Sequence, residues 1–121
     1  MDDKVALARE LDDLTEHWSQ RTVAEANGSL FKVAKGIGPT TWHSHDDQDE
    51  TFLLVDGSLT VQLRDRDVAL GPGDLFVVPR GVAHCPRADE EARFLVIGTT
   101  ITSTAAGGKP DWSHDGGRPP E

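Results

Sequence analysis

The segment His43-Ser44-His45, followed by Glu50, holds the residue types best suited to chemistry in this chain. Side chains two positions apart in a β-strand point to the same face, so a strand there would project both imidazoles together. Antiparallel pairing would then bring Glu50, at the start of the next expected strand, beside the two histidines. His84, farther along at the start of another expected strand, would supply a third imidazole.

Three imidazoles and one carboxylate predict a site for one divalent transition metal. This donor set suits Fe, Mn, Ni, Cu or Zn better than Mg or Ca. Binding requires neutral imidazoles and an ionised Glu50, so the affinity should fall as the pH drops below the histidine pKa. A His-x-His pair alone is often only a polar strand edge, and the addition of Glu50 at this spacing favours the metal site.

The elements that must position these residues are a helix and many short strands. Residues 2–18 are predicted to form an amphipathic helix, because Leu11, Leu14 and Trp18 continue an apolar spacing of three and four. From residue 21 the pattern has period two and is broken by turns such as Asp56-Gly57, which predicts a sandwich or barrel. The expected strands are Thr22–Ala26, Leu30–Lys35, Thr41–His45, Thr51–Val55, Leu59–Arg64, Val68–Leu70, Leu75–Val78, Ala83–Arg87 and Arg93–Thr99, with turns that include Asp89–Glu91.

Length and composition limit the class of protein. A chain of 121 residues with a net charge of −9 predicts one domain and argues against nucleic acid or an anionic membrane as partner. The single cysteine, Cys85, excludes an internal disulfide. The sequence has no apolar run long enough to predict a membrane span, and its acidic start is unlike a signal peptide. We therefore expect a cytoplasmic protein. The expected organisation is an N-terminal helix over 1–19, a barrel over 20–104 and a flexible tail over 105–121.

Two short motifs resemble those of the cupin superfamily. The first cupin motif, G-x5-H-x-H-x3–4-E-x6-G, is matched by Gly38, His43, His45, Glu50 and Gly57. The second, G-x5-P-x-G-x2-H-x3-N, is matched by a set of four residues: Gly73, Pro79, Gly81 and His84. The chain departs from the pattern in two places, since the Gly38–His43 interval is one residue short and Ala88 replaces the final asparagine.

The resemblance implies an all-β fold, a double-stranded β-helix (cupin or jelly-roll) barrel, here with a short N-terminal helix. It also implies a metal held inside the barrel by His43, His45, Glu50 and His84, and a homodimer. Both departures from the motifs lie outside this ligand set.

Alternation predicts which side chains line the pocket around the metal. If Glu50 faces inward, Phe52 and Leu54 share its face, and Val61 and Leu63 face inward on the neighbouring strand. Such a pocket suits a small, partly apolar molecule. The best cationic candidates for a phosphate group are Lys35 and Arg80, near strand ends, so sugar-phosphate isomerase chemistry is less favoured. Cys85 is expected to face away from His84, and Trp42 to pack under the helix or at a dimer contact.

The favoured function is a metalloenzyme with dioxygenase-, cyclase- or isomerase-type chemistry on a small organic molecule. Glu50 would be first a ligand, and a catalytic base if it leaves the metal. A second hypothesis is a module that binds a small molecule or a metal without turnover. A third is a metal that only stabilises the barrel.

Overall fold

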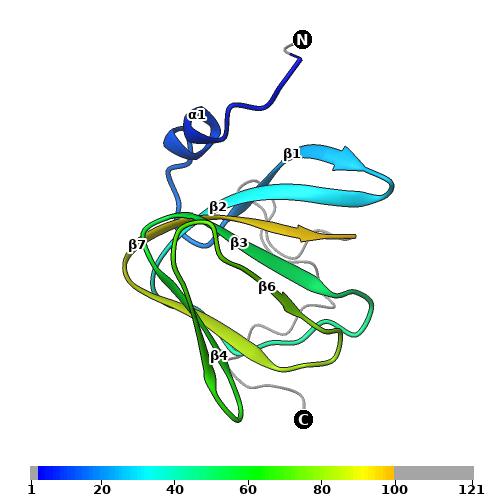
Figure 1. Cartoon of the computed structure of the whole chain (residues 1–121), viewed down its shortest axis with the longest axis vertical. Coiled ribbons are helices and arrows are strands. Elements are labelled where there is room, and N and C mark those ends of the chain that lie inside the picture. Colours follow the sequence, from blue (N-terminus) through cyan, green and yellow to red (C-terminus); the bar gives the residue numbers. More distant parts are fainter. Residues whose placement is uncertain (1–2, 100–121) are drawn as a thin grey trace.

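A computed structural model describes residues 3–99, which form one short helix and seven strands (Figure 1). Their bounds are α1 Leu7–Asp12, β1 Gln20–Ala26, β2 Ser29–Pro39, β3 Glu50–Asp56, β4 Leu59–Leu63, β5 Asp67–Leu70, β6 Leu75–Val78 and β7 His84–Gly98. The predicted tail over 105–121 and the last residues of the predicted barrel segment lie outside the described residues.

The strands pair antiparallel in the order β1-β2-β7-β3-β6, and β4 joins β5 to β7. The first residues of β7, His84–Arg87, pair with β4, whereas its last residues pair with β2 and β3. Figure 1 shows β7 curving around one end of the barrel, so that its first and last residues lie on different walls. This arrangement confirms the predicted all-β double-stranded β-helix.

Strict alternation on β3 and β4 builds the interior of the barrel. Glu50, Phe52 and Leu54 on β3 are buried, and the residues between them are only partly buried. The same pattern on β4 buries Leu59, Val61 and Leu63. These faces meet in one apolar core with residues of β2, β5, β6 and β7, and each side chain removed from water adds to its stability.

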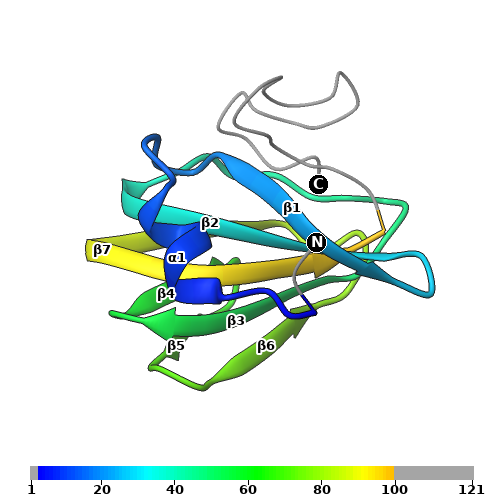
Figure 2. The same cartoon turned by 90° about the horizontal axis from the view of Figure 1, so that it is seen from above.

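The N-terminal helix is shorter than predicted. The helical spacing of residues 2–18 is realised only over Leu7–Asp12, and this helix lies against the sheet beside β2 (Figure 2). There Leu11 packs in one cluster with Val33 and Leu95. Trp18 leaves the helical path because its φ is 68°. Its ring packs against Gly36, where a Cβ would lie only 2.5 Å from the ring, and against Phe94.

Three local predictions were wrong. Thr41–His45 is not a strand but makes one isolated bridge, His43 to His84. The expected strands Ala83–Arg87 and Arg93–Thr99, with a turn over Asp89–Glu91, are the single strand β7. The three acidic residues are exposed and form a bulge in β7, because Ala88 pairs with Gly38 and Ala92 pairs with Gly36, which leaves Asp89–Glu91 opposite the single residue Ile37. The turn propensity of this stretch therefore appears as a bulge within one strand rather than as a reversal of the chain.

Replacing Gly57 by alanine is expected to lower the free energy of unfolding by about 2–4 kcal/mol. Gly57 has a φ of +86°, and an added Cβ would lie 2.5 Å from the carbonyl oxygen of Glu91 in β7. Gly73→Ala is the matched control, because its φ is +89° but nothing lies within 4 Å of the added Cβ, so only about 1–2 kcal/mol should be lost. Urea denaturation measures both, and equal losses would contradict the steric role of Gly57.

Strand β6 forms an edge of the sheet and exposes apolar side chains. Leu75 and Val77 are 56% and 42% exposed. Exposed apolar residues on an edge strand are compatible with association, but the homodimer stays a prediction. Within residues 3–99, no helix has the length and apolar character needed to cross a bilayer.

Candidate metal centre

Four residues expected to bind a metal lie together at one end of the barrel. One donor atom from each of His43, His45, Glu50 and His84 lies within 4.8 Å of the others. Glu50 begins β3 and His84 begins β7, whereas His43 and His45 lie in the connection between β2 and β3. His45, Glu50 and His84 are at most 2% exposed, and His43 is half-buried.

Backbone hydrogen bonds hold this connection in place. His43 and His84 exchange two of them, with N···O distances of 3.0 and 2.9 Å. The amide of Gly81 donates to the carbonyl of His45 at 2.8 Å. The loop before β7 and the loop before β3 are therefore tied together at the cluster, which compensates for the missing strand.

The orientation of two imidazole rings is set by backbone carbonyls. Nδ1 of His43 lies 2.8 Å from the carbonyl oxygen of Thr41, and Nδ1 of His84 lies 2.9 Å from that of Val82. A carbonyl oxygen only accepts, so both Nδ1 atoms carry the hydrogen, and a neutral ring then presents a lone pair at Nε2. Metal-binding histidines are oriented by the same kind of outer hydrogen bond.

The carboxylate of Glu50 faces these nitrogens. Its Oε1 lies 2.9 Å from Nε2 of His84 and 3.5 Å from Nε2 of His45. A lone pair on Nε2 and a carboxylate oxygen are both acceptors, so a cation must lie between them, either a proton on an imidazole or a metal ion. The donor set of three imidazoles and one carboxylate fits a divalent transition ion.

The protonation states at neutral pH match what a metal requires. Burial, with repulsion from His84 as a second cause, lowers the pKa of His43 to about 3. Burial alone would raise the pKa of Glu50, but hydrogen bonds and charge from His45 and His84 outweigh it and hold that pKa well below 4.5. His43 is therefore neutral and Glu50 ionised, the forms that bind a metal.

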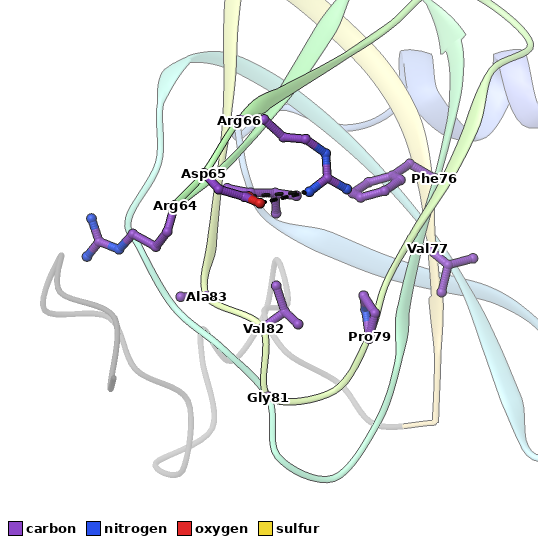
Figure 3. A pocket seen from close by; sticks show the side chains of 10 residues that line it. Arg64, Asp65, Arg66, Phe76, Val77, Pro79, Gly81, Val82 and Ala83 are labelled. Atoms are coloured by element: carbon purple, nitrogen blue, oxygen red, sulfur yellow. Dashed lines mark hydrogen bonds and ion pairs between the residues drawn. The ribbon is translucent and has the colours of Figure 1, made fainter.

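A cavity of about 520 Å³ is lined by residues of β4, β6 and the segments that follow them (Figure 3). Its wall includes Leu63, which pairs with His84 across β4 and β7, and Val82, whose carbonyl receives the His84 hydrogen bond. Figure 3 shows Arg66 extending toward the ring of Phe76, whereas Arg64 points away from the cavity. The cavity thus combines an apolar wall with the ion pair of Arg66 and Asp65, and two of its lining residues, Leu63 and Val82, neighbour His84.

The predicted pocket residues have different places. The ring of Phe52 faces the imidazole of His84, with 6.1 Å between ring centroids. Leu54 and Val61 are buried in the apolar core, whereas Leu63 also lines the cavity. Phe52 and Leu63 are therefore the members of the predicted set that adjoin the cluster.

Other expected roles are corrected or supported by contacts. Lys35 does not face the barrel interior: its Nζ donates to the carbonyl of Leu14 beneath the N-terminal segment. The Trp42 ring lies under the guanidinium of Arg64, at 4.3 Å, rather than under the helix. Cys85 is buried as a small side chain, with Sγ 3.6 Å from the Thr40 carbonyl oxygen. His17 follows the helix, and its Nε2 lies 3.0 Å from Oε2 of Glu91.

The sequence interpretation missed Lys32. This lysine is 0% exposed and lies on β2 with the same parity as Ala34, a residue of the barrel core. Val33, between them, packs on the outer face under the N-terminal segment. The signal that could have found Lys32 is the alternation of Lys32 and Ala34 against Val33 and Lys35, read with the correct inward face.

Comparison with known proteins agrees with this geometry. A family model described as "Cupin domain" matches residues 29–98, which is more than half of the chain and includes all four clustered residues. The chain belongs to the cupin family.

Two cupin comparisons cover most of the barrel. A cupin-2 domain protein from Shewanella frigidimarina has a solved structure that matches with a TM-score of 0.75 and 36% identity, over 77% of this chain and 91% of that one. The protein YdbB of Bacillus subtilis is 29% identical over 89 residues, which are 73% of this chain and 76% of YdbB.

A more distant relative is an enzyme. The 3-hydroxyanthranilate 3,4-dioxygenase of Xanthomonas campestris is 25% identical over 77 residues. The match covers 60% of this cupin but only 44% of the dioxygenase. This cupin thus shares less than half of that enzyme's length.

Proposed function

We propose that this cupin is a metalloenzyme that binds one divalent transition ion through His43, His45, Glu50 and His84 and converts a small, partly apolar organic molecule. One observation carries the proposal: four buried or half-buried donors converge within 4.8 Å, and two of the rings are held by backbone carbonyls with Nε2 toward the cluster. Burying three imidazoles and a carboxylate is costly, and ordinary apolar residues would pack the core better. Core packing therefore does not explain this cluster.

A bound ion would supply Lewis acidity or a site for oxygen activation. The chain's own residues would do the rest. The three imidazoles hold the ion, and the Glu50 carboxylate balances part of its charge. Glu50 is also the group able to take a proton from a substrate if it leaves the metal. The wall of Leu63, Phe76 and Val82 would bind the apolar part of the substrate and exclude water from it.

Oxygen-dependent chemistry is the first reaction type to test. The similarity to 3-hydroxyanthranilate 3,4-dioxygenase supports it, together with the partly apolar cavity whose wall includes Leu63 and Val82, neighbours of His84. Cyclase and isomerase chemistry use the same Lewis-acid property and remain the alternatives within this proposal.

The test starts from protein purified without oxygen and analysed for its metal content. The protein is then loaded with Fe²⁺, Mn²⁺, Ni²⁺, Cu²⁺ or Zn²⁺ and screened for oxygen uptake and substrate loss with hydroxylated aromatic acids, enols and diketones. We expect turnover with at least one ion, and its loss in His43→Ala. A loaded protein that neither consumes oxygen nor alters any member of the panel would overturn the enzymatic proposal.

A structural role for the metal is the second candidate. It is favoured by the connection between β2 and β3, which is tied to β7 at the cluster through the His43–His84 bridge. In that case chelation would lower the melting temperature and no substrate would turn over. The same metal-loaded samples distinguish the two candidates.

A further inference from the structure

Lys32 places a cationic side chain inside the barrel near the candidate metal centre. In the β-sheet register, Lys32 pairs with Val96 of β7, and Val96 pairs with Phe52 of β3. Glu50 lies two residues before Phe52 and shares its inward face. Neighbouring strands are about 4.8 Å apart, so a lysine side chain that crosses β7 on the inside reaches the region of Glu50.

The electrostatic partner of Lys32 is the expected metal ligand itself. Glu50 is the charged group that stabilises the ammonium, against a larger cost of burial that lowers the pKa of Lys32. Lys35, three residues later, shows the alternative: it faces the other side of β2, and its Nζ donates to the Leu14 carbonyl. Lys35 therefore binds the N-terminal segment through a hydrogen bond, whereas the charge of Lys32 lies inside the barrel.

A buried ammonium is expensive, and an apolar side chain of similar shape at such a position is often neutral or stabilising. The site of Lys32 is surrounded by core residues such as Ala34 and Val96, which a methionine would suit. Stability alone therefore does not explain a lysine there. An effect on the charge of the neighbouring cluster does.

The charges at the centre can be counted. Three neutral imidazoles contribute nothing, and the negative charge of Glu50 is balanced by Lys32. A divalent ion in this site would keep both of its positive charges uncompensated within the barrel. Without Lys32 the carboxylate would cancel one of them. A more positive centre repels cations more and attracts anions more.

We propose that Lys32 is a specificity-determining residue that makes the metal-loaded centre select anionic ligands, such as carboxylates, phenolates or enolates, at the expense of affinity for the ion. This inference rests on the proposed metal site and adds the charge of its substrate. Among the charged residues that line the cavity, Arg64 and Arg66 outnumber Asp65, with which Arg66 is paired, so the net charge of the lining is positive, the sign that would admit such an anion.

The test compares Lys32→Met with Lys35→Met, a matched control on the opposite face of the same strand. Binding of Co²⁺ is measured by competition with a chromophoric chelator, and azide is then titrated into the Co²⁺-loaded proteins by visible absorption. In Lys32→Met we expect Co²⁺ affinity to rise roughly tenfold and azide affinity to fall roughly tenfold. Lys35→Met should leave both affinities as in the unmodified protein.

Lys32→Gln keeps a hydrogen-bond donor without the charge, on a side chain one atom shorter, and it also serves if the methionine variant does not fold. It should behave as Lys32→Met does. Retention of both affinities in Lys32→Gln, or unchanged affinities in Lys32→Met, would overturn the role of the charge while the metal site stands. Failure of the unmodified protein to bind Co²⁺ would instead remove the metal site, and this inference with it.

Discussion

Replacing His84 by alanine is expected to lower the affinity for a divalent transition ion by more than about a hundredfold, because loss of an outer hydrogen-bond partner alone costs 10–100-fold. His84 is 1% exposed, its Nε2 lies 2.9 Å from Glu50, and its Nδ1 is held by the Val82 carbonyl. Alanine would remove one of the four donors and one of the two imidazoles that stabilise the Glu50 carboxylate. Metal content after dialysis and chelator competition measure the loss.

His17→Ala is the control for this experiment. His17 is exposed, contacts Glu91 and lies outside the cluster, so its removal should leave metal affinity unchanged. Circular dichroism of both variants checks that the barrel is retained. Full stoichiometry and unchanged affinity in His84→Ala would show that the ion binds somewhere else.

Acidification of the metal-free protein from pH 6.5 toward 3 is expected to lower the free energy of unfolding by about 1.4 kcal/mol per pH unit. The pKa of His43 is lowered from 6.5 to about 3 in the folded protein, so the unfolded chain binds a proton in this range that the folded one does not. Stability then rises with pH and is lost as the pH falls. Below about 4.5, Glu50 adds a second loss of the same sign, because its pKa is also lowered in the folded state.

Urea denaturation in the presence of a chelator, repeated between pH 7 and pH 4, measures this slope. His43→Gln is the control, since it cannot take up the proton and should flatten the curve between pH 6.5 and 4.5. A flat curve for the unmodified protein in that window would mean that His43 titrates in the folded state as it does in the unfolded chain.

The candidate site was predictable because its signal is local. His43, His45 and Glu50 lie within eight consecutive residues, and the second motif places His84 before a strand. The barrel followed from period-two patterns on β3 and β4, where every second residue is buried. Both kinds of information depend on neighbours in the chain, and the structure confirms the fold and brings the four residues together.

What could not be predicted depends on which strand lies beside which. The pattern of β2 does not say which of its two faces is covered by the N-terminal segment, so Lys35 was assigned to the interior and Lys32 was overlooked. The acidic stretch Asp89–Glu91 has the composition of a turn, but it lies in the middle of β7. The apolar spacing of the N-terminal segment continues to Trp18, but the helix ends at Asp12 and the Trp18 ring packs against Gly36 of β2.

The long strand β7 also has a consequence for how the chain folds. Its ladder with β2 joins Leu30 to Gly98, so most of the described chain, residues 30–98, must close before that pairing forms. Folds dominated by such non-local pairings fold slowly, on the order of milliseconds to seconds. Three of the four donors, in contrast, sit in one short stretch and can meet within nanoseconds to microseconds. During biosynthesis, His43, His45 and Glu50 would therefore come together as an incomplete ligand set first. His84 would complete the set only when β7 has paired.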